Sequence, residues 1–148
     1  MLEQLESLHL EQLGSYVDAL NRGGCGWLAL IISDELTERN IEHELILLTD
    51  APEGTELIED LEQFRWDYQL VHVMCKIDGY VLDCDGVDHN DNFKTNNSWG
   101  RLYNQIPMTR EIISSWVEQT DNWNYAFDQS SVPCLRETVK QFFAESSL

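Results

Sequence analysis

Two short runs of apolar residues, at 70–77 and 80–86, flank an Asp-Gly pair at residues 78–79. Apolar side chains recur at alternate positions in both runs, and Asp-Gly between such runs is typical of the two-residue turn of a β-hairpin. A type I′ turn at this place sets Cys75 opposite Leu82. The chain is therefore predicted to contain an antiparallel pair of strands, and the rest of the fold must pack against it.

The two faces of this hairpin differ in their chemistry. One face carries apolar side chains throughout, including Cys75 and Cys84, and is expected to be core. The opposite face carries His72, Asp83 and Asp85, with Asp85 directly across from His72. Carboxylates beside a histidine are able to orient its ring, so this second face is a candidate site.

Apolar spacing elsewhere predicts the remaining elements of the fold. Three-and-four spacing predicts helices at residues 2–20, 25–40, 53–64, 108–119 and 133–144. Residues 44–49 form a continuous apolar run that predicts a short buried strand, and the polar stretch 88–105 predicts a long loop. This order predicts one domain, residues 1–148, of the α+β class, in which helices pack on a small antiparallel sheet.

The charge of the chain excludes one class of partner. Its 148 residues include 27 acidic and 9 basic side chains, a net charge of −18. Such a surface repels phosphate, so direct nucleic-acid binding is excluded, and the expected partner is a basic peptide, a polyamine or a cationic protein. The longest apolar run, 27–32, is too short to cross a bilayer, and the acidic start at 1–6 is unlike a secretory signal. We therefore expect no membrane contact and a cytoplasmic location.

Cys25 stands where a buried helix is expected to begin, directly after two glycines at 23–24. The unpaired backbone N–H groups and the positive end of the helix dipole favour a thiolate there. The glycines let a second backbone approach the sulfur, which leaves room for a substrate carbonyl and for donors to its oxyanion. A nucleophile of this kind requires a base, and His72 is the candidate.

The chain resembles the papain-like and transglutaminase-like cysteine enzymes in two segments, GGCGWLA at residues 23–29 and HVMCKIDGYVLD at residues 72–83. In those enzymes a Cys at a helix N-terminus is followed by a His on a strand and by an Asp or Asn on the next strand. The resemblance implies a papain-like or transglutaminase-like core with Cys25 as nucleophile and His72 as base. Transglutaminase-like members place the Asp diagonal to the His, which selects Asp83 as orienter over Asp85.

Two further likenesses add candidate members of this site. Papain-like enzymes place an oxyanion-donating Gln shortly before the Cys, where this chain has Asn21. The tetrapeptide NSWG at 97–100 spells the one that carries the orienting Asn of papain, so Asn97 is an alternative third member. Residues 22–25, RGGC, are similar to the start of the arylamine N-acetyltransferase signature, in which one more residue precedes the Cys.

The remaining cysteines are expected to have structural roles. Cys75 and Cys84 lie on the apolar face of the hairpin, and Cys134 lies in the last predicted helix, so all three are expected to be core thiols. The predicted register places His72 and the two hairpin cysteines on opposite faces of the sheet. A tetrahedral zinc site cannot form across a sheet, so no metal site is expected.

Two functions from different classes follow. The resemblance implies cysteine-dependent acyl transfer, by hydrolysis, deamidation or transamidation of an amide or thioester, with no metal or organic cofactor. The alternative is a non-catalytic acidic binding protein, such as a viral inhibitor that imitates nucleic acid and occupies a basic surface. Residues 1–74 carry 3 basic and 16 acidic side chains, against 6 and 11 in residues 75–148, which favours an acidic partner face in the N-terminal half.

Overall fold

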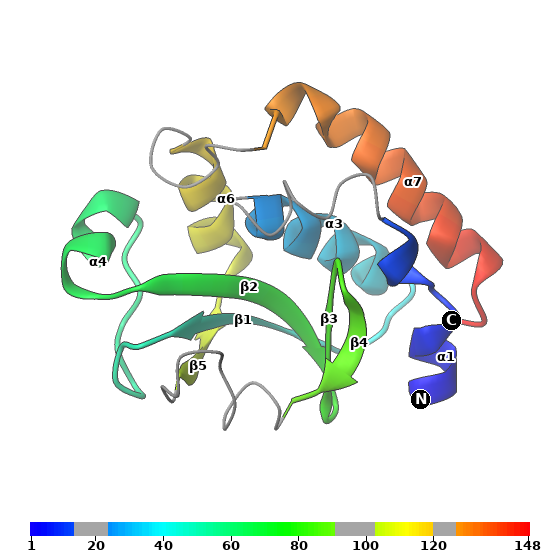
Figure 1. The fold of residues 1–148 in the computed structure, drawn as a ribbon, viewed down its shortest axis with the longest axis horizontal. Coiled ribbons are helices and arrows are strands. Elements are labelled where there is room, and N and C mark those ends of the chain that lie inside the picture. The colour runs from blue at the N-terminus through cyan, green and yellow to red at the C-terminus, as the bar shows by residue number, and fades with distance from the viewer. Residues whose placement is uncertain (14–23, 91–102, 120–126) are drawn as a thin grey trace.

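The computed structural model describes residues 1–13, 24–90, 103–119 and 127–148. In these ranges the chain forms an α+β fold, with helices packed on an antiparallel sheet (Figure 1). The helices are α1 (Leu2–Glu6), α3 (Cys25–Glu38), α4 (Leu61–Asp67), α6 (Arg110–Glu118) and α7 (Val132–Glu145), with the 3₁₀ turns η1 (Leu10–Gln12) and η3 (Gln129–Ser131). The strands are β1 (Glu44–Thr49), β2 (Leu70–Ile77), β3 (Tyr80–Asp83), β4 (Gly86–His89) and β5 (Asn104–Met108). They are ordered β4-β3-β2-β1-β5 in the sheet.

The predicted hairpin is confirmed as β2 and β3, and its register is the expected one. Cys75 pairs with Leu82. The turn type is different, because Asp78 has a φ of 52° whereas Gly79 lies outside the left-handed region. A type I′ turn requires positive φ at both residues, so that detail of the prediction is wrong.

Two strands overlap the ends of the loop that the sequence predicted over residues 88–105. β4 returns along β3 because Gly86, with a φ of 107°, lets the chain reverse directly after β3. β5 pairs with β1 at the other edge of the sheet. Its Pro107 weakens the strand signal in the sequence. Proline is nevertheless tolerated in an edge strand, because one side of that strand has no neighbouring strand to which its backbone N–H groups must donate.

The other predicted elements agree with the structure in most places. The strand at 44–49 and the helices that became α3, α6 and α7 are confirmed. The single helix predicted over 2–20 is wrong in its described part, because His9 adopts a left-handed conformation with a φ of 53° that separates α1 from η1. The acidic helix predicted from residue 53 begins only at Leu61, where the Asp60 side chain accepts a hydrogen bond from the Gln63 N–H and caps α4.

The main core lies between α3 and the sheet. α3 packs on β2 and β3, and α6 and α7 pack against α3 (Figure 1). Asp34 of α3 joins these helices, since its carboxylate oxygens lie 2.6 Å from Arg110 of α6 and 2.7 Å from Arg136 of α7. A smaller apolar cluster that includes Ile46 and Met74 is also buried. None of the described helices is long and apolar enough to span a membrane.

Candidate catalytic site

Cys25 is the first residue of α3 and is buried, with 6% of its surface exposed. The residue before it, Gly24, has no side chain to cap the helix, and the first turn contains no acidic residue. The positive end of the α3 dipole and its first N–H groups therefore have no carboxylate partner within the first turn. The α3 dipole favours a thiolate at Cys25.

His72 lies on β2 and contacts Asp83 on β3. The two atoms that meet are Nε2 of His72 and Oδ2 of Asp83, at 2.9 Å, and both side chains are largely buried. The pairing between β2 and β3 ends at Cys75 and Leu82, so this contact lies beyond the paired part of the hairpin. Asp83 is therefore the carboxylate that contacts His72, and the expected pairing of Asp85 directly across from His72 is wrong.

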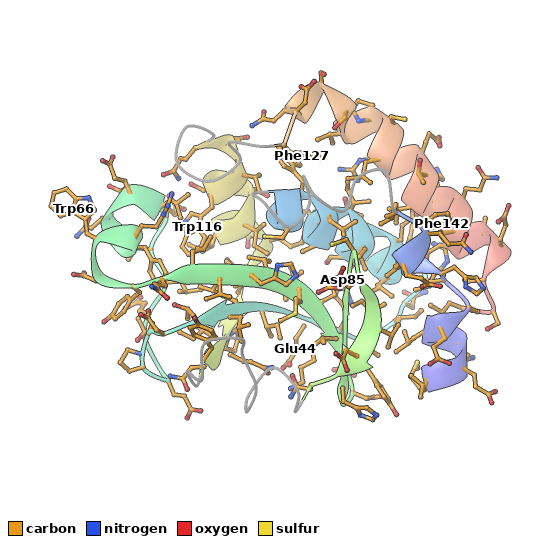
Figure 2. All side chains as sticks on the ribbon, viewed as in Figure 1. Glu44, Trp66, Asp85, Trp116, Phe127 and Phe142 are labelled. Carbon is orange, nitrogen blue, oxygen red and sulfur yellow. The ribbon has the colours of Figure 1, made fainter. Side chains whose placement is uncertain are left out.

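Asp83 is itself held in place by the turn that follows it. Its second oxygen, Oδ1, accepts a hydrogen bond of 2.8 Å from the backbone N–H of Asp85. The carboxylate of Asp85, the other candidate orienter, is exposed, and Figure 2 shows this residue at the tip of the turn between β3 and β4. Asp85 thus acts on the site through its backbone, a contribution that side-chain chemistry in the sequence does not reveal.

A narrow cavity brings the three candidate catalytic residues together. It is lined by Cys25, Leu28, Ala29, His72, Val73, Leu82, Asp83 and Cys84. The space among these side chains is too narrow for a water molecule. A substrate would therefore reach the sulfur only when the lining side chains move apart.

The expectation that His72 and the two hairpin cysteines lie on opposite faces of the sheet is wrong. Cys84 lines this cavity together with His72, and Cys75 contacts Ala29, which also lines it. The register between β1 and β2 pairs Leu48 with His72 and Thr49 with Leu70, which leaves Val71 as an extra residue. Such a β-bulge re-aims the side chains next to it. Simple alternation along β2 therefore does not hold at His72, and the bulge turns the imidazole toward α3.

The surroundings of His72 favour its charged form. Burial lowers the pKa of His72, but its hydrogen bond to Asp83 and its electrostatic interactions with Asp83 and Cys25 outweigh burial and raise this pKa to about 10. Because Nε2 contacts Asp83, the other ring nitrogen, Nδ1, is the one left for the thiol. At neutral pH the arrangement holds an imidazolium between a carboxylate and the Cys25 sulfur.

The other three cysteines differ from Cys25 and from one another. Cys75 is fully buried, its Sγ donates a hydrogen bond to the Ala29 carbonyl at 3.3 Å, and burial raises its pKa. Burial, with the nearby negative charges, raises the pKa of Cys84 to about 12. These two core thiols are confirmed as buried, whereas Cys134 is exposed and its predicted burial is wrong. Cys134 lies one position before Leu135, which is on the buried face of α7, and Cys134 itself is not on that face.

Asn21 and Asn97, the alternative oxyanion donor and orienter, lie outside the described residues. No group of three or more His, Cys, Asp or Glu side chains within the described ranges is arranged to hold a metal ion.

A second histidine contact was not anticipated from the sequence. Nδ1 of His43 lies 2.9 Å from the Ile41 carbonyl oxygen and so carries a hydrogen, which leaves Nε2 to accept the hydroxyl of Ser33 at 2.7 Å. Ser33 is buried in the middle of α3, where the backbone amides are bonded within the helix. The pair joins α3 to the residue before β1 and lines an open pocket of about 320 Å³ that also includes Arg110.

Comparison of the chain with models of protein families, with curated proteins and with solved structures finds no match in any of the three.

Proposed function

We propose that this chain is a cysteine-dependent acyl-transfer enzyme with a papain-like or transglutaminase-like core. The observation that carries the proposal is the position of His72, which lies 2.9 Å from Asp83 and lines the same narrow cavity as Cys25 at the start of α3. A nucleophile, a base and a carboxylate that orients the base form the arrangement used for nucleophilic catalysis. The order Cys on a helix, His on β2 and Asp on β3 also supports the resemblance found in the sequence.

In the proposed first step the Cys25 thiolate forms a bond to the carbonyl carbon of an amide or thioester, and the carbonyl π electrons move to the oxygen. The oxyanion then returns its electron pair and expels the leaving group. His72 gives its proton to that group and becomes neutral. A raised pKa suits this role, because the imidazole still carries the proton when it must be donated.

In the proposed second step water or an amine attacks the thioester that links the acyl group to Cys25. His72 takes a proton from the attacking group, the carbon–sulfur bond breaks, and the thiolate leaves. The site then holds an imidazolium and a thiolate again, so the proposed cycle requires no metal or redox cofactor. The net charge of −18 raises the local concentration of cationic amines, which favours a polyamine or a basic peptide as substrate or acceptor.

The proposal predicts the pH dependence of alkylation at Cys25. In a Cys134→Ser background, which removes the exposed thiol, we expect iodoacetamide to modify Cys25 at nearly the same rate at about pH 6 and about pH 8. A free cysteine in solution slows about a hundredfold over that interval as its thiolate protonates. Because the narrow cavity slows the reaction equally at both values, the ratio of the rates is informative where the absolute rate is not. Intact mass and peptide mapping identify the modified residue.

Two variants complete this experiment. His72→Ala should lower the alkylation rate at about pH 6 by at least tenfold, because the imidazolium that stabilises the thiolate is lost. His89→Ala, an exposed histidine on β4, is the matched control and should leave the rate unchanged. If Cys25 is inert, or follows the profile of a free thiol with and without His72, the enzyme proposal fails.

A non-catalytic acidic binding protein is the second candidate function, and the closed cavity around Cys25 favours it. Exposed carboxylates occur on α1, α4, α6 and α7 rather than along one track, which weakens the comparison with nucleic acid. Their densest run is residues 50–67, in the N-terminal half as that hypothesis expects. An inert Cys25 in the alkylation experiment would leave this function as the one to pursue.

A further inference from the structure

Trp66 is an unusual surface residue of this protein. It is 82% exposed, while Leu61 and Phe64 on the same short helix are buried against the core. Figure 2 shows its indole at one end of the molecule, pointing away from the fold. A tryptophan buries a large apolar area when it is covered, and most of the surface of Trp66 is left open to a partner.

The surroundings of Trp66 are strongly negative. An open groove of about 380 Å³ is lined by Asp60, Glu62, Gln63 and Trp66, and we call these four residues the α4 surface. The segment from residue 50 to residue 67 exposes seven carboxylates, which belong to Asp50, Glu53, Glu56, Glu59, Asp60, Glu62 and Asp67. Arg65 is the single basic residue of this segment, and none of the seven carboxylates forms an ion pair within the described part of the chain.

We propose that the α4 surface docks a segment of a partner protein that is rich in arginine and lysine. A guanidinium or ammonium group stacked on the indole of Trp66 is attracted by the face of the ring. Neighbouring basic side chains of the same segment would pair with Asp60 and Glu62, whose charges are not neutralised within the described residues. An aromatic anchor with a polar rim is the usual composition of a protein-binding hot spot.

This proposal goes beyond the catalytic one and does not require a reactive Cys25. The α4 surface lies on a different element from the cysteine, and Cys25→Ala should leave docking unchanged. If both proposals hold, the surface would retain a basic protein substrate while its acyl group or amine reaches the cavity. The two proposals therefore fail independently, in separate experiments.

The test uses a fluorescein-labelled peptide of about ten residues that alternates arginine and glycine, with binding measured by anisotropy. Trp66→Ala should weaken binding at least about tenfold while leaving the net charge unchanged, so that the loss reports the indole alone. The double variant Asp60→Asn/Glu62→Gln should weaken binding to a similar extent and reduce its dependence on salt. Asparagine at position 60 retains the ability to cap α4.

The matched control is Glu3→Gln/Glu137→Gln, which removes two exposed carboxylates from α1 and α7, away from α4 (Figure 1). It should change the affinity by less than about twofold, since rim charges remote from a contact act mainly through the screened field. Equal binding by the wild type and Trp66→Ala would overturn the proposal. Equal weakening by the two double variants would also overturn it, because it would show diffuse charge attraction only.

Discussion

The imidazole of His72 is expected to remain protonated well above neutral pH and to lose its proton near pH 10. Burial alone would lower this pKa, so the expected value depends on the interactions of the imidazole with Asp83 and Cys25. Asp83→Asn removes the negative charge that lies 2.9 Å from Nε2. The pKa of His72 should then fall, by about one to three pH units, which is typical of the loss of an opposite charge at this distance.

This expectation is measured by following the ring resonances of His72 by NMR as the pH is raised, with His72→Ala used to assign them. Asp85→Asn is the matched control. It removes one negative charge from an exposed side chain two residues after Asp83, and it keeps the backbone N–H that holds Asp83. It should leave the titration of His72 almost unchanged. A wild-type midpoint near the ordinary 6.5, or equal shifts in the two variants, would contradict the proposed pairing.

The same titration sets the direction of the pH dependence of catalysis. In the proposed first step His72 donates a proton, so turnover should be sustained while the imidazole is protonated and should fall as the pH rises through about 10. In Asp83→Asn this alkaline fall should move to lower pH, following the lower pKa. The NMR titration therefore predicts where the alkaline limb of a rate profile will lie once a substrate is found.

Trp116→Ala is expected to lower the free energy of unfolding by about 3–5 kcal/mol, the range measured for large-to-small changes in cores. Trp116 is fully buried on α6, its ring centroid lies 5.1 Å from that of Phe64, and its Nε1–H donates a hydrogen bond of 2.8 Å to the Ile58 carbonyl. The substitution leaves a cavity and an unpaired carbonyl. It should also loosen α4, which α6 holds through these contacts.

Urea denaturation measures this loss, and the chain supplies its own control. Trp66→Ala makes the same chemical change on an exposed side chain and should alter the free energy of unfolding by no more than about 0.5 kcal/mol. A small effect at Trp116 would show that α6 is not part of the cooperative core. A large effect at Trp66 would show that its indole is covered in solution, and would remove the basis for docking at the α4 surface.

Much of the fold was accessible from local sequence signals. The pairing of Cys75 with Leu82 follows from Asp-Gly between two apolar runs, and the start of α3 at Cys25 follows from the glycines and the apolar spacing behind it. The sequence analysis did not predict β4 and β5, because their own residues favour a strand only weakly. β4 is short and polar, and β5 contains Pro107, so both depend on a neighbouring strand to supply hydrogen bonds.

For the candidate site, local sequence signals identify the residue types and the elements that carry them: a cysteine at a helix start, and a histidine and an aspartate on adjacent strands. That these residues meet depends on how the elements pack in three dimensions. The alternation of side chains along a strand is reliable only while the ladder is regular, and the bulge at Val71 turns His72 toward α3. The packing of α3 on β2 then brings Cys25 to this histidine, because a contact between distant segments is set by how whole elements pack and not by local spacing.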